Sequence, residues 1–295
     1  MKVTFLGTGT SHGVPVIACD CAVCKSSDPH DKRTRSSVYI QTDDNKFILI
    51  DIGPDFRTQA LRENIRQIDA VLLTHHHADH LFGLDDLRNF SCIMSNKPDN
   101  PQNKKYDRPP IPFYTNHTAA EYLKHSFGYL FSEHAEGGGH AKISLHEIDT
   151  LPDFTLGDTT ITPVPMLHGS LKTTGWLLTE NQKSIAYLTD CNFISDESIQ
   201  LIHKTIENKN SRLTHLVIDG LRIKEHSTHF NFLQALEVSS KIGADHIWFT
   251  HLTHNSSHEE TAAYLAEHRA EFPGLESALS ILPAYDGLTL STVVE

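Results

Sequence analysis

Short apolar segments rich in β-branched residues recur along this chain of 295 residues and predict strands. They are VTFLG (3–7), SVYIQ (37–41), KFILID (46–51), AVLLT (70–74), TITPVP (160–165), GWLLT (175–179), SIAYLTD (184–190), HLVID (215–219), HIWFT (246–250) and LTLST (288–292). Several end in Asp, Thr-His or Gly. Buried strands end in this way when they deliver polar side chains to one edge of a sheet.

Longer segments with helical spacing lie between these strands. PDFRTQALREN (54–64) has a proline near its first turn, and SDESIQLIHKTIEN (195–208) opens with Ser and Asp as candidate caps. FNFLQALEVSSKIG (230–243) places apolar residues on one face and stops at Gly243. Strands come first and then alternate with helices, twice over. This order predicts one domain with two packed sheets and helices outside them.

Composition and charge narrow the class of protein. With 39% hydrophobic and 21% charged residues, the chain is typical of a globular enzyme. MKVTFLGTGTSHGVP reads as a first strand and lacks a signal-peptide pattern, and no stretch approaches transmembrane length, so we expect a cytoplasmic protein. The formal net charge of −12 argues against binding polyanionic nucleic acid through the overall field. We expect the 95–110 stretch, rich in Pro, Asn and Lys, to be an exposed loop.

The segment HHHADH follows the strand AVLLT and carries His75, His76, His77, Asp79 and His80. Imidazoles at i and i+2 in a turn can converge on one ion, and the Asp-His pair can face a second. Four ligand-type side chains in six residues would be costly to bury unless metal satisfied them. A solvated histidine-rich loop is the alternative.

Three later strand ends carry further ligand-type side chains. His168 follows TITPVPML, Asp190 ends SIAYLTD, and His251 ends HIWFT. Each alone is more often a cap or a satisfied core group. Together with the HHHADH turn, they complete two coordination spheres.

Three cysteines, Cys19, Cys21 and Cys24, lie within six positions in ACDCAVC. Three thiols cannot pair as disulfides without leaving one over, and structural zinc needs four such ligands, so a metal is the first interpretation. Free or redox-active cysteines are the alternative. Cys92 and Cys191 match no motif, and we expect ordinary buried thiols there.

The HHHADH turn with the later His, Asp and His resembles the metallo-β-lactamase fold superfamily, whose motif is THxHxDH. The resemblance covers nearly the whole chain, from LGTGTSHGVP to THLTH. It implies a four-layer αββα sandwich formed by a single domain, 1–295, with a variable insertion around 92–150. The implied ligands are His75, His77 and His168 for one metal, Asp79, His80 and His251 for the other, and Asp190 as the bridge. Asp51, in LIDIG, is implied to support the metal turn, Asp79 is also assigned a catalytic role, and His76 is not a ligand in this pattern.

Further motifs indicate which branch of the superfamily the chain resembles. LGTGTSHGVP resembles the phosphodiesterase branches, and His229 in STHFNFLQAL matches the position at which those members are thought to keep a general acid. An N-cap or packing histidine is the alternative for His229, and His226 is the weaker local candidate. The Cys-x-Cys-x-x-Cys motif resembles the subgroup of the phosphonate-pathway cyclic phosphate phosphodiesterase. There the fourth ligand of a structural zinc is the second histidine of Thr-His-x-x-His, here His254 in THLTH.

The resemblance therefore implies a metal-dependent phosphoric diester hydrolase. We expect metal-hydroxide attack on phosphorus in a small phosphodiester or cyclic phosphate, such as a ribosyl 1,2-cyclic phosphate. Two divalent ions, Zn²⁺ or Mn²⁺, and one structural Zn²⁺ are implied, with a homodimer but no nucleic-acid or membrane partner. A tRNA 3′-processing endonuclease and a non-hydrolytic metal protein linked to cofactor biosynthesis are the alternatives. Arg33 and Arg35 could contact phosphate or form a solvated basic turn.

Overall fold

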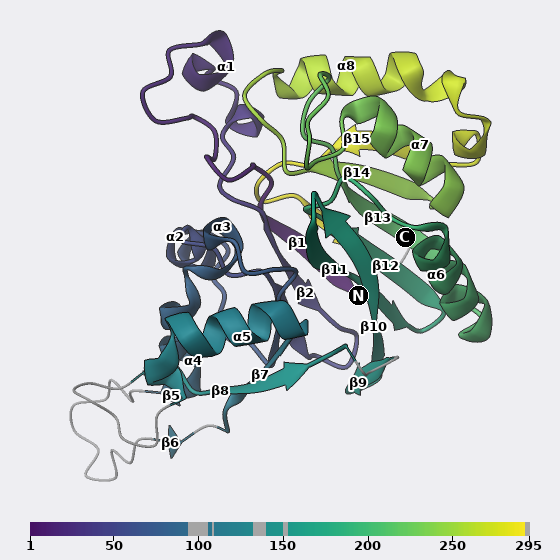
Figure 1. The fold of residues 1–295 in the computed structure, drawn as a ribbon. Coiled ribbons are helices and arrows are strands. Elements are labelled where there is room, and N and C mark those ends of the chain that lie inside the picture. Colours follow the sequence, from purple (N-terminus) through teal and green to yellow (C-terminus); the bar gives the residue numbers. More distant parts are fainter. Residues whose placement is uncertain (94–105, 108, 132–139, 150–152, 293–295) are drawn as a thin grey trace.

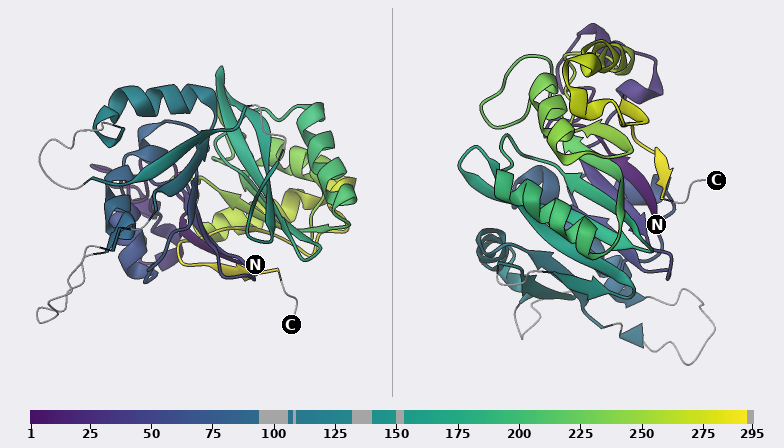
Figure 2. Two further views of the ribbon diagram at one scale, coloured as in Figure 1. Left: turned by 90° about the horizontal axis from the view of Figure 1, so that it is seen from below. Right: turned by 90° about the vertical axis from the view of Figure 1, so that its right-hand side faces the viewer.

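The computed structural model describes residues 1–93, 106–107, 109–131, 140–149 and 153–292. Within these residues, most strands belong to two seven-stranded sheets (Figure 1). The first sheet contains β1 (Lys2–Gly7), β2 (Ser37–Gln41), β3 (Phe47–Ile50), β4 (Ala70–Leu72), β7 (Ile111–Thr115), β8 (Ile143–Glu147) and β16 (Thr289–Ser291). Its strand order is β16-β1-β2-β3-β4-β7-β8. Strands β1 and β16 are antiparallel neighbours, so the two ends of the described chain lie side by side (Figure 2).

The second sheet is built from the C-terminal half of the chain. It contains β9 (Phe154–Leu156), β10 (Thr159–His168), β11 (Leu171–Glu180), β12 (Lys183–Leu188), β13 (Arg212–Asp219), β14 (His246–Thr250) and β15 (Ser280–Pro283). Its order is β15-β14-β13-β12-β11-β10-β9. A separate pair joins β5 (Cys92–Ile93) and β6 (Tyr106–Asp107).

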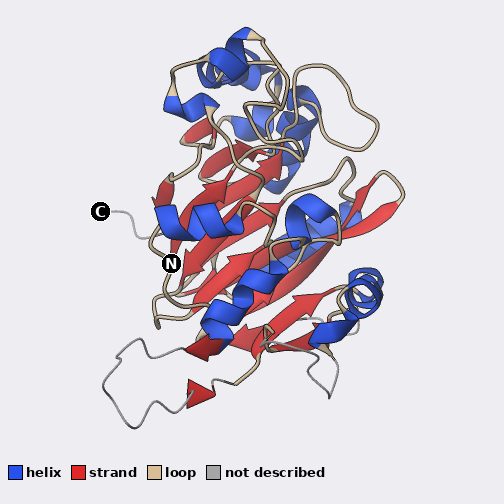
Figure 3. Ribbon diagram, turned by 90° about the vertical axis from the view of Figure 1, so that its left-hand side faces the viewer, coloured by secondary structure: helices blue, strands red, loops and turns tan. Residues whose placement is uncertain are grey.

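The helices are α1 (Ala22–Lys25), α2 (Phe56–Arg62), α3 (Ala78–Leu81), α4 (Arg88–Ser91), α5 (His117–Ser126), α6 (Asp196–Asn208), α7 (Phe232–Ile242) and α8 (His258–His268). Except for α1, which lies in the N-terminal loop, the helices lie on the outer sides of the sheets (Figures 1 and 3). Helices α2 to α5 lie beside the first sheet, and α6, α7 and α8 lie beside the second. None of the helices in the described ranges has the length and apolar character needed to cross a bilayer.

Three apolar cores hold these layers together. The core between the sheets includes Phe5, Ile50, Trp176 and Val217, which are completely or almost completely buried. A second cluster fills the space under α2, α4 and α5, and a third fills the space under α6, α7 and α8. Helix, sheet, sheet and helix therefore form four layers, and the predicted αββα sandwich is confirmed.

The predicted helices begin and end where their sequence signals lie. Ser195 accepts a hydrogen bond from the backbone N–H of Ser198 and caps α6. Asn231 and Gln234 form a capping box at the start of α7, which ends before Gly243, a residue with φ of 73°. All ten predicted strands are present with small shifts at their ends.

Several elements were not predicted from the pattern. Strands β7 and β8 and helix α5 fall within the expected insertion around 92–150, yet β7 pairs with β4 and both strands extend the first sheet. Most of the predicted 95–110 loop and of the glycine-rich 134–140 segment lies outside the described residues. The segment 92–150 therefore contributes regular structure to the sandwich.

Strand direction brings the predicted ligands to one edge of both sheets. Strands β3 and β4 are parallel, as are β12, β13 and β14, and β10 runs in the same direction as β12 because both are antiparallel to β11. Asp51, the HHHADH turn, His168, Asp190 and His251 lie at or just after the C-terminal ends of these strands. The candidate site lies where these ends meet.

Candidate metal centre

Two groups of ligand-type side chains meet at the sheet edge and share one carboxylate. The first group is His75, His77, His168 and Asp190, and the second is Asp79, His80, Asp190 and His251. Within each group, the candidate ligand atoms all lie within 4.8 Å of one another. The structure thus brings together all seven residues that the sequence suggested as catalytic-metal ligands.

Asp190 lies between the two groups. Its Oδ2 is 3.4 Å from Nε2 of His75 and 3.2 Å from Nε2 of His80, and its Oδ1 is 2.8 Å from Nε2 of His251. Two ligand atoms held about 2.0–2.2 Å from one ion at a tetrahedral angle lie about 3.3–3.6 Å apart. The separations to Oδ2 are therefore close to those of atoms sharing an ion, and this carboxylate is placed to bridge two ions.

Hydrogen bonds fix the orientation of three of the histidine rings. Nδ1 of His80 donates to Oδ2 of Asp51 at 2.7 Å, and Nδ1 of His168 donates to the carbonyl oxygen of Thr228 at 2.7 Å. Nδ1 of His75 lies 3.0 Å from Oγ1 of Thr74, and this hydroxyl is 3.0 Å from Oδ2 of Asp51. In each ring Nδ1 is engaged in this way, which leaves Nε2 as the nitrogen that can face an ion, as in metal-ligating histidines.

Buried atoms without partners show that this donor set fits metal ions. Nε2 of His75, His80 and His251 and Oδ1 of Asp190 are buried and form no hydrogen bond of acceptable geometry within the described part of the chain, although the last two atoms lie 2.8 Å apart. A buried polar atom left without a partner is costly. Imidazole nitrogens and carboxylate oxygens suit Zn²⁺ and Mn²⁺, so an ion at each group would satisfy these atoms.

The charges in this cluster raise the pKa of two histidines, so that metal binding would release protons. Burial lowers the pKa of His251, but Asp190 and Asp79 raise it more, and the pKa of His251 rises to about 10. Burial likewise lowers the pKa of His80, but Asp79, Asp190 and Asp51 raise it well above its ordinary value. Divalent ions would displace these protons on binding.

His229 lies beside the two groups and is held by a buried carboxylate. Its Nδ1 donates to Oδ2 of Asp219 at 2.8 Å, and Asp219 also accepts the backbone N–H of Cys191. The ring of His229 stacks on that of His251 with centroids 4.8 Å apart, and it lies 4.5 Å from the ring of His168. The helix that follows is capped by Asn231, so His229 is not its N-cap.

Three other residues of interest do not belong to the ligand groups. The ring of His76 packs against that of Tyr122 of α5 in a tilted arrangement, with centroids 4.7 Å apart. Arg33 is buried and donates to Thr8 Oγ1 and to the carbonyl oxygen of Ala284. Arg35 is bound to Asp55 and to the backbone of Ser11. Both arginines are engaged within the protein, so the structure supports neither a phosphate contact nor a solvated turn for them.

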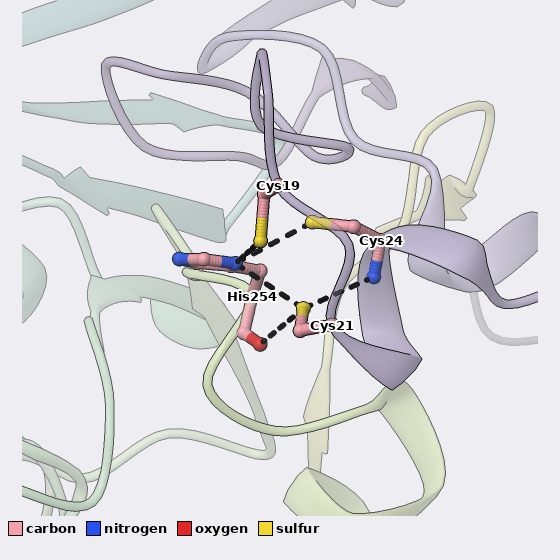
Figure 4. Close-up of side chains that lie close together, drawn as sticks. All are labelled: Cys19, Cys21, Cys24 and His254. Atoms are coloured by element: carbon pink, nitrogen blue, oxygen red, sulfur yellow. Dashed lines mark hydrogen bonds between the residues drawn. The ribbon is translucent and has the colours of Figure 1, made fainter.

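The cysteine motif forms a second, separate cluster (Figure 4). The sulfur atoms of Cys19, Cys21 and Cys24 lie 3.3, 3.4 and 3.4 Å from Nδ1 of His254. In tetrahedral zinc, with Zn–S of about 2.3 Å and Zn–N of about 2.0–2.1 Å, these atoms would be about 3.5 Å apart. Three thiols and one imidazole nitrogen thus have the spacing of a closed zinc site.

The thiols also have the environment of metal ligands. The backbone N–H of Cys24 donates to the sulfur of Cys21 and lowers the pKa of Cys21 to about 6. Burial raises the pKa of Cys24 to about 11, so without a metal this cluster would keep a protonated thiol there. Cys191 is buried in the core under α6 and α7, as expected, whereas the side chain of Cys92 lies outside the described residues.

The sequence interpretation missed Asp219, Thr74 and Thr228 as supporting residues. Asp219 carried a signal, because it ends the strand HLVID just as Asp190 ends SIAYLTD. Thr228 acts through its carbonyl oxygen, which no side-chain motif reveals.

Comparisons with known proteins agree with the fold and with the presence of a candidate metal centre. The profile described as a beta-lactamase superfamily domain matches residues 46–252. An octanoyltransferase of Porphyromonas gingivalis is 36% identical over 282 residues, which are 95% of this chain and 52% of that protein. This chain therefore spans only about half the length of that curated relative.

Solved structures extend the comparison to the whole fold. A structure described as a new diphosphatase from the PhnP family has 38% identity and a TM-score of 0.77, covering 98% of this chain and 97% of that one. Zn²⁺-bound PqqB from Methylobacterium extorquens has 18% identity and a TM-score of 0.73, covering 99% of this chain and all of that one, and at this identity it shows the fold alone. The chain belongs to the β-lactamase superfamily of metal-dependent hydrolases and, within it, to the PhnP family.

Proposed function

We propose that this protein is a dinuclear-metal phosphodiesterase that hydrolyses a small phosphodiester or a cyclic phosphate. The observation that carries this is the position of His229, which Asp219 holds beside two ligand groups that share Asp190. A 38% identical diphosphatase of the PhnP family also cleaves at phosphorus, which supports the same reaction class. We propose Zn²⁺ or Mn²⁺ for the pair and Zn²⁺ for the cysteine cluster.

The residues around the two metal ions would have different roles in the hydrolysis. Two divalent ions, when bound, supply activated water at neutral pH and offset the negative charge of the phosphate. Asp51 and Thr74 orient the rings of His75 and His80. Oδ2 of Asp79, whose side chain is 12% exposed, lies 3.2 Å from Nε2 of His80 and is placed to accept a proton from the attacking water.

His229 would act on the opposite side of the reaction, at the leaving oxygen. Because Asp219 accepts the proton on Nδ1, the second proton of the imidazolium lies on Nε2 and can pass to that oxygen. An alkoxide leaves poorly without a proton, whereas a nitrophenolate leaves unaided. The pair of His229 and Asp219 is therefore suited to the hydrolysis of esters of ordinary alcohols.

Cleavage of a diphosphate linkage is the second candidate, and only the name of the 38% identical structure favours it. A phosphate leaving group needs less protonation than an alkoxide, so this chemistry would depend less on His229. The tRNA 3′-end endonuclease suggested by the sequence would need a basic surface to hold its substrate, which the net charge of −12 does not favour. A non-hydrolytic role in cofactor biosynthesis has only a shared fold with the 18% identical PqqB, which does not support a role, and acyl transfer is named only for a relative of which this chain spans 52%.

One comparison of substrates tests the proposal. The metal-loaded protein is offered bis(p-nitrophenyl) phosphate, a ribosyl cyclic phosphate, a dinucleoside diphosphate and a precursor tRNA. We expect turnover of the first two. Cleavage of precursor tRNA without activity on either small diester would contradict the proposal, and cleavage of the diphosphate alone would favour the second candidate.

A further inference from the structure

The loop between β13 and α7, residues 220–231, is tied to itself by hydrogen bonds. At its base, the N–H of Leu221 donates to the carbonyl oxygen of Phe230 at 3.0 Å. At its tip, the guanidinium of Arg222 donates to the carbonyl oxygens of Lys224 and Glu225 at 3.2 and 3.1 Å. The exposed tip therefore has a defined conformation.

The same loop is anchored to the turn that carries a candidate metal ligand. The carbonyl oxygen of Thr228 accepts from Nδ1 of His168 at 2.7 Å, and that of Ser227 accepts from Nδ2 of Asn192 at 3.1 Å. Asn192 in turn accepts the N–H of Gly169, the residue after His168, at 2.7 Å. The loop is thus held in a fixed position relative to the centre.

His226 is the residue that this loop places next to His229. The two ring centroids are 5.2 Å apart, and His229 is itself 4.5 Å from the ring of His168 and 4.8 Å from that of His251. His229 is 8% exposed, whereas His226 is exposed to the solvent. His226 therefore lies one ring farther out from the ligand groups and nearer to the solvent.

The hydrogen bonds of His226 determine which of its nitrogens can donate. Nδ1 accepts the backbone N–H of Thr228 at 3.3 Å, and an amide N–H only donates, so in the neutral ring the proton is on Nε2. Burial, then the charges of His229 and Arg222, lower the pKa of His226 and favour that neutral ring. Nε2–H has no partner within the described part of the chain and is a free donor beside the general acid.

We propose that His226 binds the leaving group of the substrate through a hydrogen bond from Nε2–H to an oxygen acceptor. This assignment rests on the proposed function, in which His229 contacts the leaving oxygen. In-line attack sends the leaving alcohol away from the attacking water, so the atoms beyond the ester oxygen pass His229 on the side where His226 lies. A leaving alcohol with further hydroxyl groups, as in a sugar, offers the acceptor, whereas a simple alkyl alcohol does not.

Two cyclic phosphates that differ in this acceptor test the assignment. Ethylene phosphate and a ribosyl cyclic phosphate both open a five-membered ring and release an alkoxide, but only the ribosyl compound carries additional hydroxyls. The measured quantity is the ratio of kcat/KM for the ribosyl compound to kcat/KM for ethylene phosphate, in the metal-loaded wild type, His226→Ala and His226→Gln. Ile223→Ala, an exposed change on the same loop, is the matched control.

We expect His226→Ala to lower this ratio about fivefold to tenfold through a higher KM for the ribosyl compound, as the loss of one hydrogen bond predicts. Glutamine keeps a donor at a similar distance, so His226→Gln should restore part of the ratio, and Ile223→Ala should keep it. A loss that is equal for both esters would mean that His226 only supports the loop, and an unchanged ratio would mean no contact; either overturns the assignment. A wild type that opens neither ester contradicts the proposed function itself.

Discussion

Three of the residues that build the candidate centre adopt a backbone conformation that side chains rarely take. Asp51, Asp190 and His251 have φ of 62°, 54° and 61°; Asp51 and His251 follow directly after a strand, and Asp190 lies two residues after the end of β12. The left-handed region costs a residue with a Cβ roughly 1–2 kcal/mol. Such strain is typical of functional sites, and here it turns the chain at the end of a strand so that the side chain lies at the sheet edge.

The role of His229 predicts a loss of activity that depends on the leaving group. His229→Ala should lower kcat about 10²-fold to 10⁴-fold on an alkyl diester, because the leaving alkoxide no longer receives a proton. On bis(p-nitrophenyl) phosphate the loss should be far smaller, because nitrophenolate leaves unaided. Steady-state kinetics on both esters measures the difference.

Asp219 provides the matched comparison for His229. Asp219→Asn keeps the size of the side chain but removes the charge that fixes Nδ1, so it should give the same dependence on the leaving group with a smaller loss. Equal losses on the two esters in both variants would refute the proton-donor role of His229.

His258, at the start of α8, predicts a pH dependence of stability. Burial, then the charges of Arg33 and His30, lower its pKa from 6.5 to about 4, and its Nδ1 faces the guanidinium of Arg33 at 3.2 Å. Between pH 6.5 and 4 the unfolded chain binds a proton at His258 that the folded chain does not, so this contribution to stability falls as the pH falls. His258→Gln keeps an acceptor for Arg33 and cannot titrate, so its free energy of unfolding should decline less steeply over this range in urea titrations.

An exposed histidine serves as the control for this titration. His125→Gln, on the surface of α5, should retain the wild-type slope. If His258→Gln and the wild type lose stability in parallel from pH 6.5 to pH 4, His258 is not the titrating group.

Among the elements, the turn THLTH after β14 connects the two candidate metal sites. His251 faces the shared Asp190, and His254, three residues later, faces the three cysteines. Leu252 between them pairs with the N-terminal loop through hydrogen bonds to Thr8 and Thr10. The cysteine cluster therefore fastens the N-terminal loop to the strand end that carries His251.

Removal of one thiol tests this fastening. Cys21→Ser should lose one zinc per chain and lower the midpoint of thermal unfolding by roughly 5–10 °C, since each kcal/mol corresponds to about 2–4 °C in large domains. The dinuclear pair should be largely kept. Metal analysis with thermal unfolding measures all three quantities.

A surface change in the same loop controls for this experiment. Ile17 is 89% exposed, and Ile17→Ser should keep the full metal content. A Cys21→Ser variant with unchanged zinc content and stability would show that the cysteines are free thiols.

The sequence predicted many of the elements whose pattern is local, but it missed β15 and also α8, although the capping box of Ser257 and Glu260 is a local signal. β-Branched runs located the ten strands, and Ser195, Asn231 and Gly243 mark helix ends through chemistry within a few residues. Strands β7 and β8 and helix α5 were also missed, although β7 alternates between buried and half-buried side chains. Their place in the sheet depends on pairing with β4, which is far away in sequence.

At the scale of the whole molecule, the site depends on where the strand ends of two sheets meet. The ligand types and their order could be predicted, because each candidate ligand follows a recognisable strand. The contacts that orient those ligands could not, because Asp51 to His80 and His168 to Thr228 join segments 29 and 60 residues apart. The outward position of His226 depends on the fold of its loop in the same way.

The most direct test of the account is diester turnover measured against metal content. The protein is stripped of metal, reloaded stepwise with Zn²⁺ or Mn²⁺, and assayed on a ribosyl cyclic phosphate with the bound metal counted at each step. We predict that turnover is absent in the stripped protein and reaches its maximum when two ions are bound in addition to the structural zinc. A fully loaded protein that hydrolyses no small phosphodiester, or one that reaches its maximum rate with a single ion in the pair, would contradict it.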